Sequence, residues 1–163
     1  DFNGFVALVD ALGGIEIDVP KAIVDENYPT FDYGVITITI PAGPQHMDGA
    51  AALIYARTRH TDSDFGRGQR QQQVLRALLV KALQPLTWPR LPAAWAVARR
   101  YFLTNLSEVD LATIFLSVVL VGPEGVQSYA IDEEMTIPYL TDSGAQVLLP
   151  RWEVILPLVG QIF

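Results

Sequence analysis

Four arginines lie within fourteen residues in the middle of the chain: Arg57, Arg59, Arg67 and Arg70. An arginine guanidinium presents paired donors in one plane and keeps its charge, so it binds phosphate or carboxylate in a bidentate manner. A cluster of this kind indicates an anionic ligand. The alternative is a solvated helix face whose arginines pair with neighbouring acids, and the spacing decides between the two.

The arginines flank a short polar turn at residues 60–64. If the chain is extended before this turn, Arg57 and Arg59 point to the same side, because strand side chains alternate. Three side chains share a face of the helix expected after the turn: Arg67, Arg70 and Gln71. The free N–H groups and positive dipole end of that helix begin at the same turn. Together these features predict a phosphate or pyrophosphate site.

Two acids in the turn, Asp62 and Asp64, could hold Mg²⁺ beside a substrate diphosphate. We favour the simpler interpretation, in which Asp64 caps the following helix and Asp62 neutralises an arginine. His60 has no second histidine at ligand spacing, so we interpret it as a polar turn residue. The sequence has no dinucleotide-binding glycine motif and no Gly-x-Ser-x-Gly elbow.

The charge pattern sets the arginine region apart. Residues 1–50 and 101–163 each carry eight acids and one base, whereas residues 51–100 carry nine bases and two acids, within a net charge of −7. A net-anionic chain without a recognisable helix-turn-helix is a poor partner for nucleic acid. The absence of cysteine excludes thiolate zinc sites and cysteine nucleophiles. A hydrophobic content of 50% excludes a disordered tail.

Hydrophobic spacing predicts the elements that must position these side chains. Helices are expected at residues 2–12, 49–56, 65–83, 93–102, 109–120 and 151–163. Strands are expected at residues 15–19, 35–40 and 126–131, and a loop at residues 21–34. Asp48 is a good helix N-cap, and Ser107 with Asp110 predicts a capping box. A helix, two glycines and a strand at the start of the chain indicate an α/β unit.

Several blocks resemble motifs of the LytR-CpsA-Psr family, in that family's own order. They are residues 5–20, residues 41–49, residues 52–59 and residues 64–71. The combination is highly specific and runs to about residue 83, after which only residues 104–107 are reminiscent of the family. The resemblance implies an α/β fold with a central mixed β-sheet flanked by helices, in three layers. Residues 1–84 would form the C-terminal half of a catalytic domain, and residues 85–163 a part that packs on it.

The family resemblance implies a bacterial envelope phosphotransferase. Such enzymes transfer a glycopolymer, for example teichoic acid or capsule, from a polyprenyl-diphosphate carrier to a peptidoglycan hydroxyl, with Mg²⁺. Positions that match diphosphate-binding residues of the family are Arg57, Arg59, Arg67 and Gln71, and Arg70 adjoins them. Asp64 matches the acid that opens the same motif. The residues expected to be catalytic are Arg59, Arg67 and Asp64.

The resemblance also implies parts that this sequence does not contain. Family members begin with a membrane-spanning helix and a first half-domain whose aspartates hold Mg²⁺. We therefore expect a fragment with an incomplete sheet, little activity alone, Mg²⁺ ligands mainly upstream, and a membrane anchor outside the chain. A homodimer is also possible. The alternative function is a non-catalytic module that binds polyprenyl-phosphate lipids or anionic wall polymers. Transcriptional attenuation is disfavoured, because it needs nucleic-acid contact.

Overall fold

The computed structural model describes residues 1–30, 32–59 and 64–162, and it divides into two compact units. The first unit is Asp1–Ser128 and the second is Tyr129–Phe163. Within the first unit, helix α4 (Leu91–Tyr101) packs on helix α1 (Phe2–Leu12). The division at residue 84 that the sequence suggests stays a prediction.

The chain starts with a helix and a strand, as the sequence predicts. Asp1 caps α1 by accepting a hydrogen bond from the Gly4 amide at 3.0 Å. Gly13 ends the helix at φ 86°, a left-handed conformation that glycine adopts without a steric cost. Strand β1 (Ile15–Val19) then alternates buried and exposed side chains. Its buried face belongs to the core of the unit.

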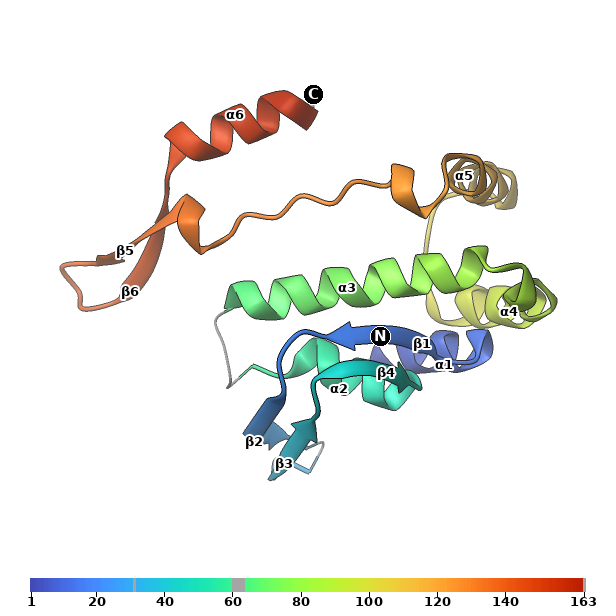
Figure 1. Ribbon diagram of the computed structural model, residues 1–163, viewed down its shortest axis with the longest axis horizontal. Coiled ribbons are helices and arrows are strands. Elements are labelled where there is room, and N and C mark those ends of the chain that lie inside the picture. Colours follow the sequence, from blue (N-terminus) through green and yellow to red (C-terminus); the bar gives the residue numbers. More distant parts are fainter. Residues whose placement is uncertain (31, 60–63, 163) are drawn as a thin grey trace. The chain divides into compact units, whose positions relative to one another are not determined.

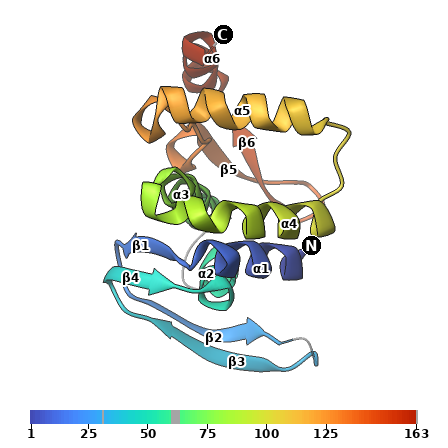
Figure 2. The same cartoon turned by 90° about the vertical axis from the view of Figure 1, so that its right-hand side faces the viewer.

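Four strands of the first unit form two antiparallel ladders, shown in Figure 2. Strand β1 pairs with β4 (Gly43–Met47), and β2 (Ile23–Pro29) pairs with β3 (Val35–Ile40). The predicted loop at residues 21–34 is wrong, since β2 occupies its first half. The polar residues of β2 interrupt the alternation of apolar and polar side chains that predicts a strand. The strand forms because it pairs with β3. The sequence does not predict strand β4, because Pro44, Gln45 and His46 are weak strand formers.

The α/β class predicted from the sequence is confirmed. Among the described residues, however, the strands form three two-stranded antiparallel ladders and no single mixed sheet. The order of the strands in the chain explains why the pairs of the first unit are antiparallel. The β2–β3 hairpin reverses the chain between β1 and β4, so these two strands run in opposite directions.

Two helices complete the core and lead to the arginine cluster. Helix α2 (Gly49–Arg57) begins at Asp48, which accepts from the Ala51 amide at 2.8 Å and confirms the predicted N-cap. Helix α3 (Asp64–Leu83) packs on β1 and α2 (Figure 1). The buried core gathers side chains from all these elements: Val9, Ile15, Ile17, Val19, Tyr55 and Val74.

The rest of the first unit is helical. A short 3₁₀ helix, η1 (Pro85–Arg90), occupies the predicted proline break and is followed by α4. Helix α5 (Glu108–Val121) begins with the predicted capping box of Ser107 and Asp110, and the 3₁₀ helix η2 (Pro123–Gly125) follows it. The predicted strand at residues 126–131 is wrong. These residues form no ladder with another described strand, and their apolar side chains are exposed.

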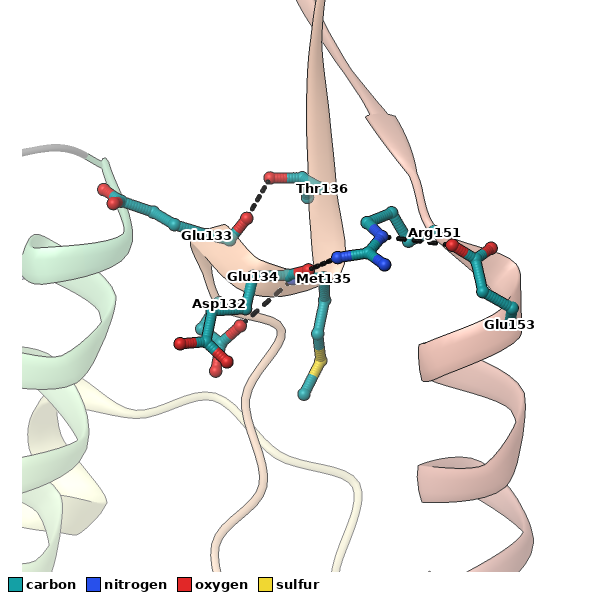
Figure 3. Close-up of polar contacts among 7 residues, drawn as sticks. All are labelled: Asp132, Glu133, Glu134, Met135, Thr136, Arg151 and Glu153. Atoms are coloured by element: carbon teal, nitrogen blue, oxygen red, sulfur yellow. Dashed lines mark hydrogen bonds and ion pairs between the residues drawn. The ribbon is translucent and has the colours of Figure 1, made fainter.

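The second unit contains one hairpin and one helix. Strands β5 (Thr136–Leu140) and β6 (Gln146–Pro150), which the sequence analysis missed, pair between the 3₁₀ helix η3 (Glu133–Met135) and α6 (Trp152–Ile162). Arg151 joins these pieces, as Figure 3 shows. Its Nη1 donates to the Glu134 carbonyl at 2.9 Å and its Nε to Glu153 Oε1 at 3.0 Å. No helix within the described ranges is long and apolar enough to cross a membrane.

Candidate functional site

The C-terminal end of α2 is held by two side chains of α3. Arg70 is only 5% exposed, and it donates from Nε to the Tyr55 carbonyl at 3.1 Å and from Nη2 to the Thr58 carbonyl. Gln71 Nε2 lies 3.5 Å from the Ala56 carbonyl oxygen. The last carbonyls of a helix lack internal partners and carry the negative end of its dipole, so a cation is favourable there. Arg70 therefore holds the segment that leaves α2.

Arg57 is the last residue of α2, and its guanidinium lies against two aromatic rings. The Arg57 Cζ atom is 4.7 Å from the Phe2 ring centroid and 5.4 Å from the Tyr28 centroid, and Nη1 is 3.3 Å from the Tyr28 hydroxyl. The predicted extended geometry of residues 57–59 is wrong at its first position, because the helix continues through Arg57. Thr58 is the first extended residue, at φ −53° and ψ 138°.

Asp25, on β2, contacts the same segment and was missed by the sequence analysis. It is 1% exposed, and its Oδ2 accepts a hydrogen bond from the backbone N–H of Arg59 at 3.2 Å. Its Oδ1 accepts from the Asn27 amide at 3.1 Å. Asp25 lies inside the predicted loop, and no local pattern marks a contact across 34 residues. A buried aspartate at alternate spacing with Ile23 is the one signal that could have found it.

The remaining candidates lie around the start of α3. Arg59 is exposed, directly after the buried Thr58, and Arg67 is partly buried in the first turn of α3. Asp64 is the first residue of this helix, and its side chain lies outside the described residues, as do His60 and Asp62. Along the chain, Arg59 directly precedes residues 60–63, and the first turn of α3 directly follows them.

A groove of about 820 Å³ runs between α3 and the connection from β1 to β2. The described residues that line it include three cations, Lys21, Arg70 and Arg76, and no Asp or Glu. Tyr55 and Gln73 also line it, and the hydroxyl of the buried Tyr55 donates to Gln73 Oε1 at 2.5 Å. The groove and the α2 end share Tyr55 and Arg70, so the two features adjoin.

The described residues do not fit a magnesium site. No group of three or more histidine, aspartate or glutamate side chains gathers among them, and Asp25 is already occupied by backbone amides. Mg²⁺ prefers several oxygen ligands in an octahedral arrangement, usually including carboxylates. The Mg²⁺ requirement therefore stays a prediction.

Comparison with known proteins decides the family. The family model described as the LytR_cpsA_psr family matches residues 1–148. This chain belongs to the LytR-CpsA-Psr family. The match covers most of the chain and reaches well beyond residue 83, where the recognisable sequence motifs fade. It therefore includes α4, α5, β5 and the first residues of β6.

Two curated LytR-CpsA-Psr relatives are similar to this chain in sequence. It is 41% identical over 86 residues to the polyisoprenyl-teichoic acid–peptidoglycan teichoic acid transferase TagV of Bacillus subtilis, covering 48% of this chain and 20% of TagV. It is 31% identical over 134 residues to the regulatory protein MsrR of Staphylococcus aureus, covering 80% of this chain and 38% of MsrR. The chain thus spans less than half the length of these relatives.

Solved structures show the same LytR-CpsA-Psr fold. The crystal structure of B. subtilis TagV matches with a TM-score of 0.72 at 23% identity, covering 99% of this chain and 61% of that one. A structure of TagT bound to LI-WTA matches with a TM-score of 0.72 at 24% identity, covering 98% and 56%. At this level of identity the likeness establishes the fold alone.

Proposed function

We propose that this chain is part of a phosphotransferase that transfers a glycopolymer from a polyprenyl-diphosphate carrier to peptidoglycan in the bacterial cell envelope, outside the cytoplasm. Family membership and the activity for which TagV is named support the reaction class. A single observation carries the site: Arg59 directly precedes residues 60–63, and Arg67 lies in the first turn of α3, which directly follows them. A helix N-terminus flanked by guanidinium groups suits a diphosphate.

The candidate residues take different roles in this proposal. Arg59 and Arg67 bind the diphosphate, and Gln71 adds a neutral donor. Asp64, the acidic residue that opens the motif, is expected to be catalytic with Arg59 and Arg67. Arg57 also matches a diphosphate-binding position of the family, and Arg70 adjoins these positions. Because their guanidinium groups contact Tyr28 and the carbonyls at the end of α2, they hold the frame and contribute positive charge from those positions.

The chemistry is an in-line phosphoryl transfer. An acceptor hydroxyl oxygen on peptidoglycan attacks the phosphorus that carries the glycopolymer. The bond from this phosphorus to the bridging oxygen breaks, polyprenyl phosphate leaves, and the hydroxyl proton passes to a base or to water. The arginines stabilise the charge on the equatorial and leaving oxygens. No step depends here on Mg²⁺, whose ligands we expect from residues outside this chain.

The second candidate is a non-catalytic module that binds polyprenyl-phosphate lipids or anionic wall polymers. The observation that favours it is the groove beside α3, whose described lining includes three cations and no Asp or Glu and so suits an anionic ligand. Both candidates use the same arginines. They differ in whether a phosphorus–oxygen bond is broken.

Binding of a soluble probe tests the site in both cases. We expect calorimetric titration of this chain with inorganic pyrophosphate or geranyl diphosphate to give saturable binding. Arg59→Ala and Arg67→Ala should each weaken it about tenfold or more, as loss of a charge-assisted contact does. Arg99→Ala, which removes an exposed arginine of α4, is the matched control and should change the Kd less than twofold.

Transfer of a labelled lipid-linked glycopolymer separates the two candidates. The complete protein that contains this chain should release polyprenyl phosphate and label peptidoglycan. Turnover that survives both arginine substitutions would contradict the proposed site. Tight binding without any transfer by the complete protein would instead support the binding module.

A further inference from the structure

Asp25 is the only buried acidic side chain among the residues whose burial the structure describes. Burying a carboxylate is costly unless hydrogen bonds or charges compensate it. Each oxygen of Asp25 accepts a hydrogen bond from a backbone amide, Oδ1 from Asn27 and Oδ2 from Arg59. The second bond joins β2 to the residue that follows α2. The buried carboxylate of Asp25 therefore holds the backbone of Arg59 in a fixed position.

We infer that Asp25 is a positioning residue that fixes Arg59 for diphosphate binding, an inference that rests on the proposed function. The register of β2 against β3 shifts between Asp25 and Tyr28. Such a bulge re-aims the side chains around it. Here the two residues on either side of the shift both contact the segment of residues 57–59, Asp25 through Arg59 and Tyr28 through Arg57.

The segment of residues 57–59 is anchored at each of its three positions. Arg57 stacks on Tyr28, the Thr58 carbonyl accepts from Arg70, and the Arg59 amide donates to Asp25. Thr58 itself is completely buried. The anchors come from β2 on one side and from α3 on the other. The backbone of Arg59 is therefore fixed while its side chain is exposed.

This arrangement has a consequence for affinity. A flexible arginine loses backbone and side-chain freedom when it binds a ligand, and that loss weakens binding. An arginine whose backbone is already fixed loses only side-chain freedom. Asp25 does not contact the ligand, since it is buried and carries the same sign of charge as a diphosphate. Its effect on binding passes through Arg59, whose backbone amide donates a hydrogen bond to it.

A merely structural role for Asp25 makes a different prediction. It would lower stability and weaken binding through every site residue alike. The positioning role predicts coupling to Arg59 and none to Arg67. A double-mutant cycle measures this difference directly.

The test measures the binding of pyrophosphate to this chain by calorimetry. Asp25→Asn should weaken pyrophosphate binding about tenfold, because the backbone amide of Arg59 loses its charged acceptor. Glu26→Gln, at the adjacent exposed position of β2, is the matched control and should stay within twofold. In an Arg59→Ala background, Asp25→Asn should have no further effect. In an Arg67→Ala background it should keep its full effect. Equal losses in both backgrounds would overturn the inference.

Amide hydrogen exchange gives a readout that needs no ligand. In the unsubstituted chain the Arg59 amide should be protected, and Asp25→Ala should remove this protection while that of β1 amides persists. If the Arg59 amide of the unsubstituted chain exchanges at the unprotected rate, the inference is overturned even if the Asp25 variants fail to fold. If pyrophosphate does not bind the unsubstituted chain, the proposed function fails, whereas exchange still reports whether Asp25 holds Arg59.

Discussion

Arg70 Nε lies 3.1 Å from the backbone carbonyl oxygen of Tyr55, and this hydrogen bond joins α3 to the end of α2. The two residues are 15 positions apart and both are buried. Arg70, which its spacing in the sequence assigns to ligand binding, therefore holds the backbone around the candidate site. Mutation can separate this structural role from ligand contacts.

Arg70→Ala should lower the free energy of unfolding by about 3 kcal/mol, because buried carbonyls of α2 lose their charged donor. Arg70→Lys should recover only part of this loss, since an ammonium lacks the planar fork that reaches two carbonyls. Urea denaturation measures both. Arg76→Ala on the same helix is the control, and its exposed ion pair with Glu124 predicts a change within about 0.5 kcal/mol. Equal effects at the two arginines would contradict the assignment.

Tyr55→Phe should lower the free energy of unfolding by about 1 kcal/mol. The substitution keeps the buried ring but removes the hydroxyl that donates to Gln73 Oε1 at 2.5 Å. Thermal unfolding followed by circular dichroism provides the measurement. Tyr33→Phe is the matched control, because the Tyr33 side chain is 99% exposed and should show no change. A Tyr55→Phe variant as stable as the control would mean that the bond contributes nothing.

Two glycine substitutions should act in opposite directions. A Cβ atom at Gly49 would lie 2.7 Å from the Cα of Val6, where α2 crosses α1 closely, so Gly49→Ala should destabilise the fold by about 2 kcal/mol. A Cβ at Gly68 meets nothing within 4 Å, so Gly68→Ala should stabilise α3 by about 0.5–1 kcal/mol. Chemical denaturation of both variants checks the signs. Stabilisation by Gly49→Ala would contradict the close packing of the two helices.

The capping box of α5 should make this helix sensitive to acid. Two hydrogen bonds hold the pKa of Asp110 below the ordinary value of an aspartate. The bond from the Ser107 hydroxyl has the larger effect, and the bond from the Ser107 backbone amide has the smaller one. A lowered pKa in the folded state means that the carboxylate stabilises the helix above its unfolded pKa. This stabilisation is lost as the pH falls through the folded pKa.

An NMR titration of the Asp110 carboxyl measures this effect. Ser107→Ala should raise the pKa of Asp110 towards its ordinary value and loosen the first turn of α5. The pKa of Asp32, lowered by the Thr30 hydroxyl in a separate turn, should not move and serves as an internal control. If Ser107→Ala leaves the pKa of Asp110 unchanged, the capping box is not the cause of the lowered pKa.

Much of the fold could be predicted because its helices are regular. The boundaries of α1, β1 and β3 follow from periodicity, and those of α2 and α5 from their caps. The failures are strands, and each has the same cause. Strand β2 exists through its ladder with β3, whereas residues 126–131 have strand-like composition but pair with no described strand. A strand is stabilised by a partner that its own sequence does not contain.

The candidate site divides in the same way. Its residue types and the start of α3 could be predicted, because they follow from side-chain chemistry and helix signals. The assignment of Arg59 and Arg67 to a diphosphate stays a prediction. The role of Asp25 could not be predicted, since β2 was expected to be a loop and its contact with Arg59 crosses 34 residues.

The sequence by itself determined the family, the helices and the location of the arginine cluster, because motifs and periodicity are local properties. Only the tertiary structure decided how these arginines are used. It ties Arg57 to Tyr28 and Arg70 to Tyr55, and it fixes Arg59 through Asp25. The physical reason is that a buried charge must find partners wherever the fold supplies them. Those partners come from elements that only folding brings together.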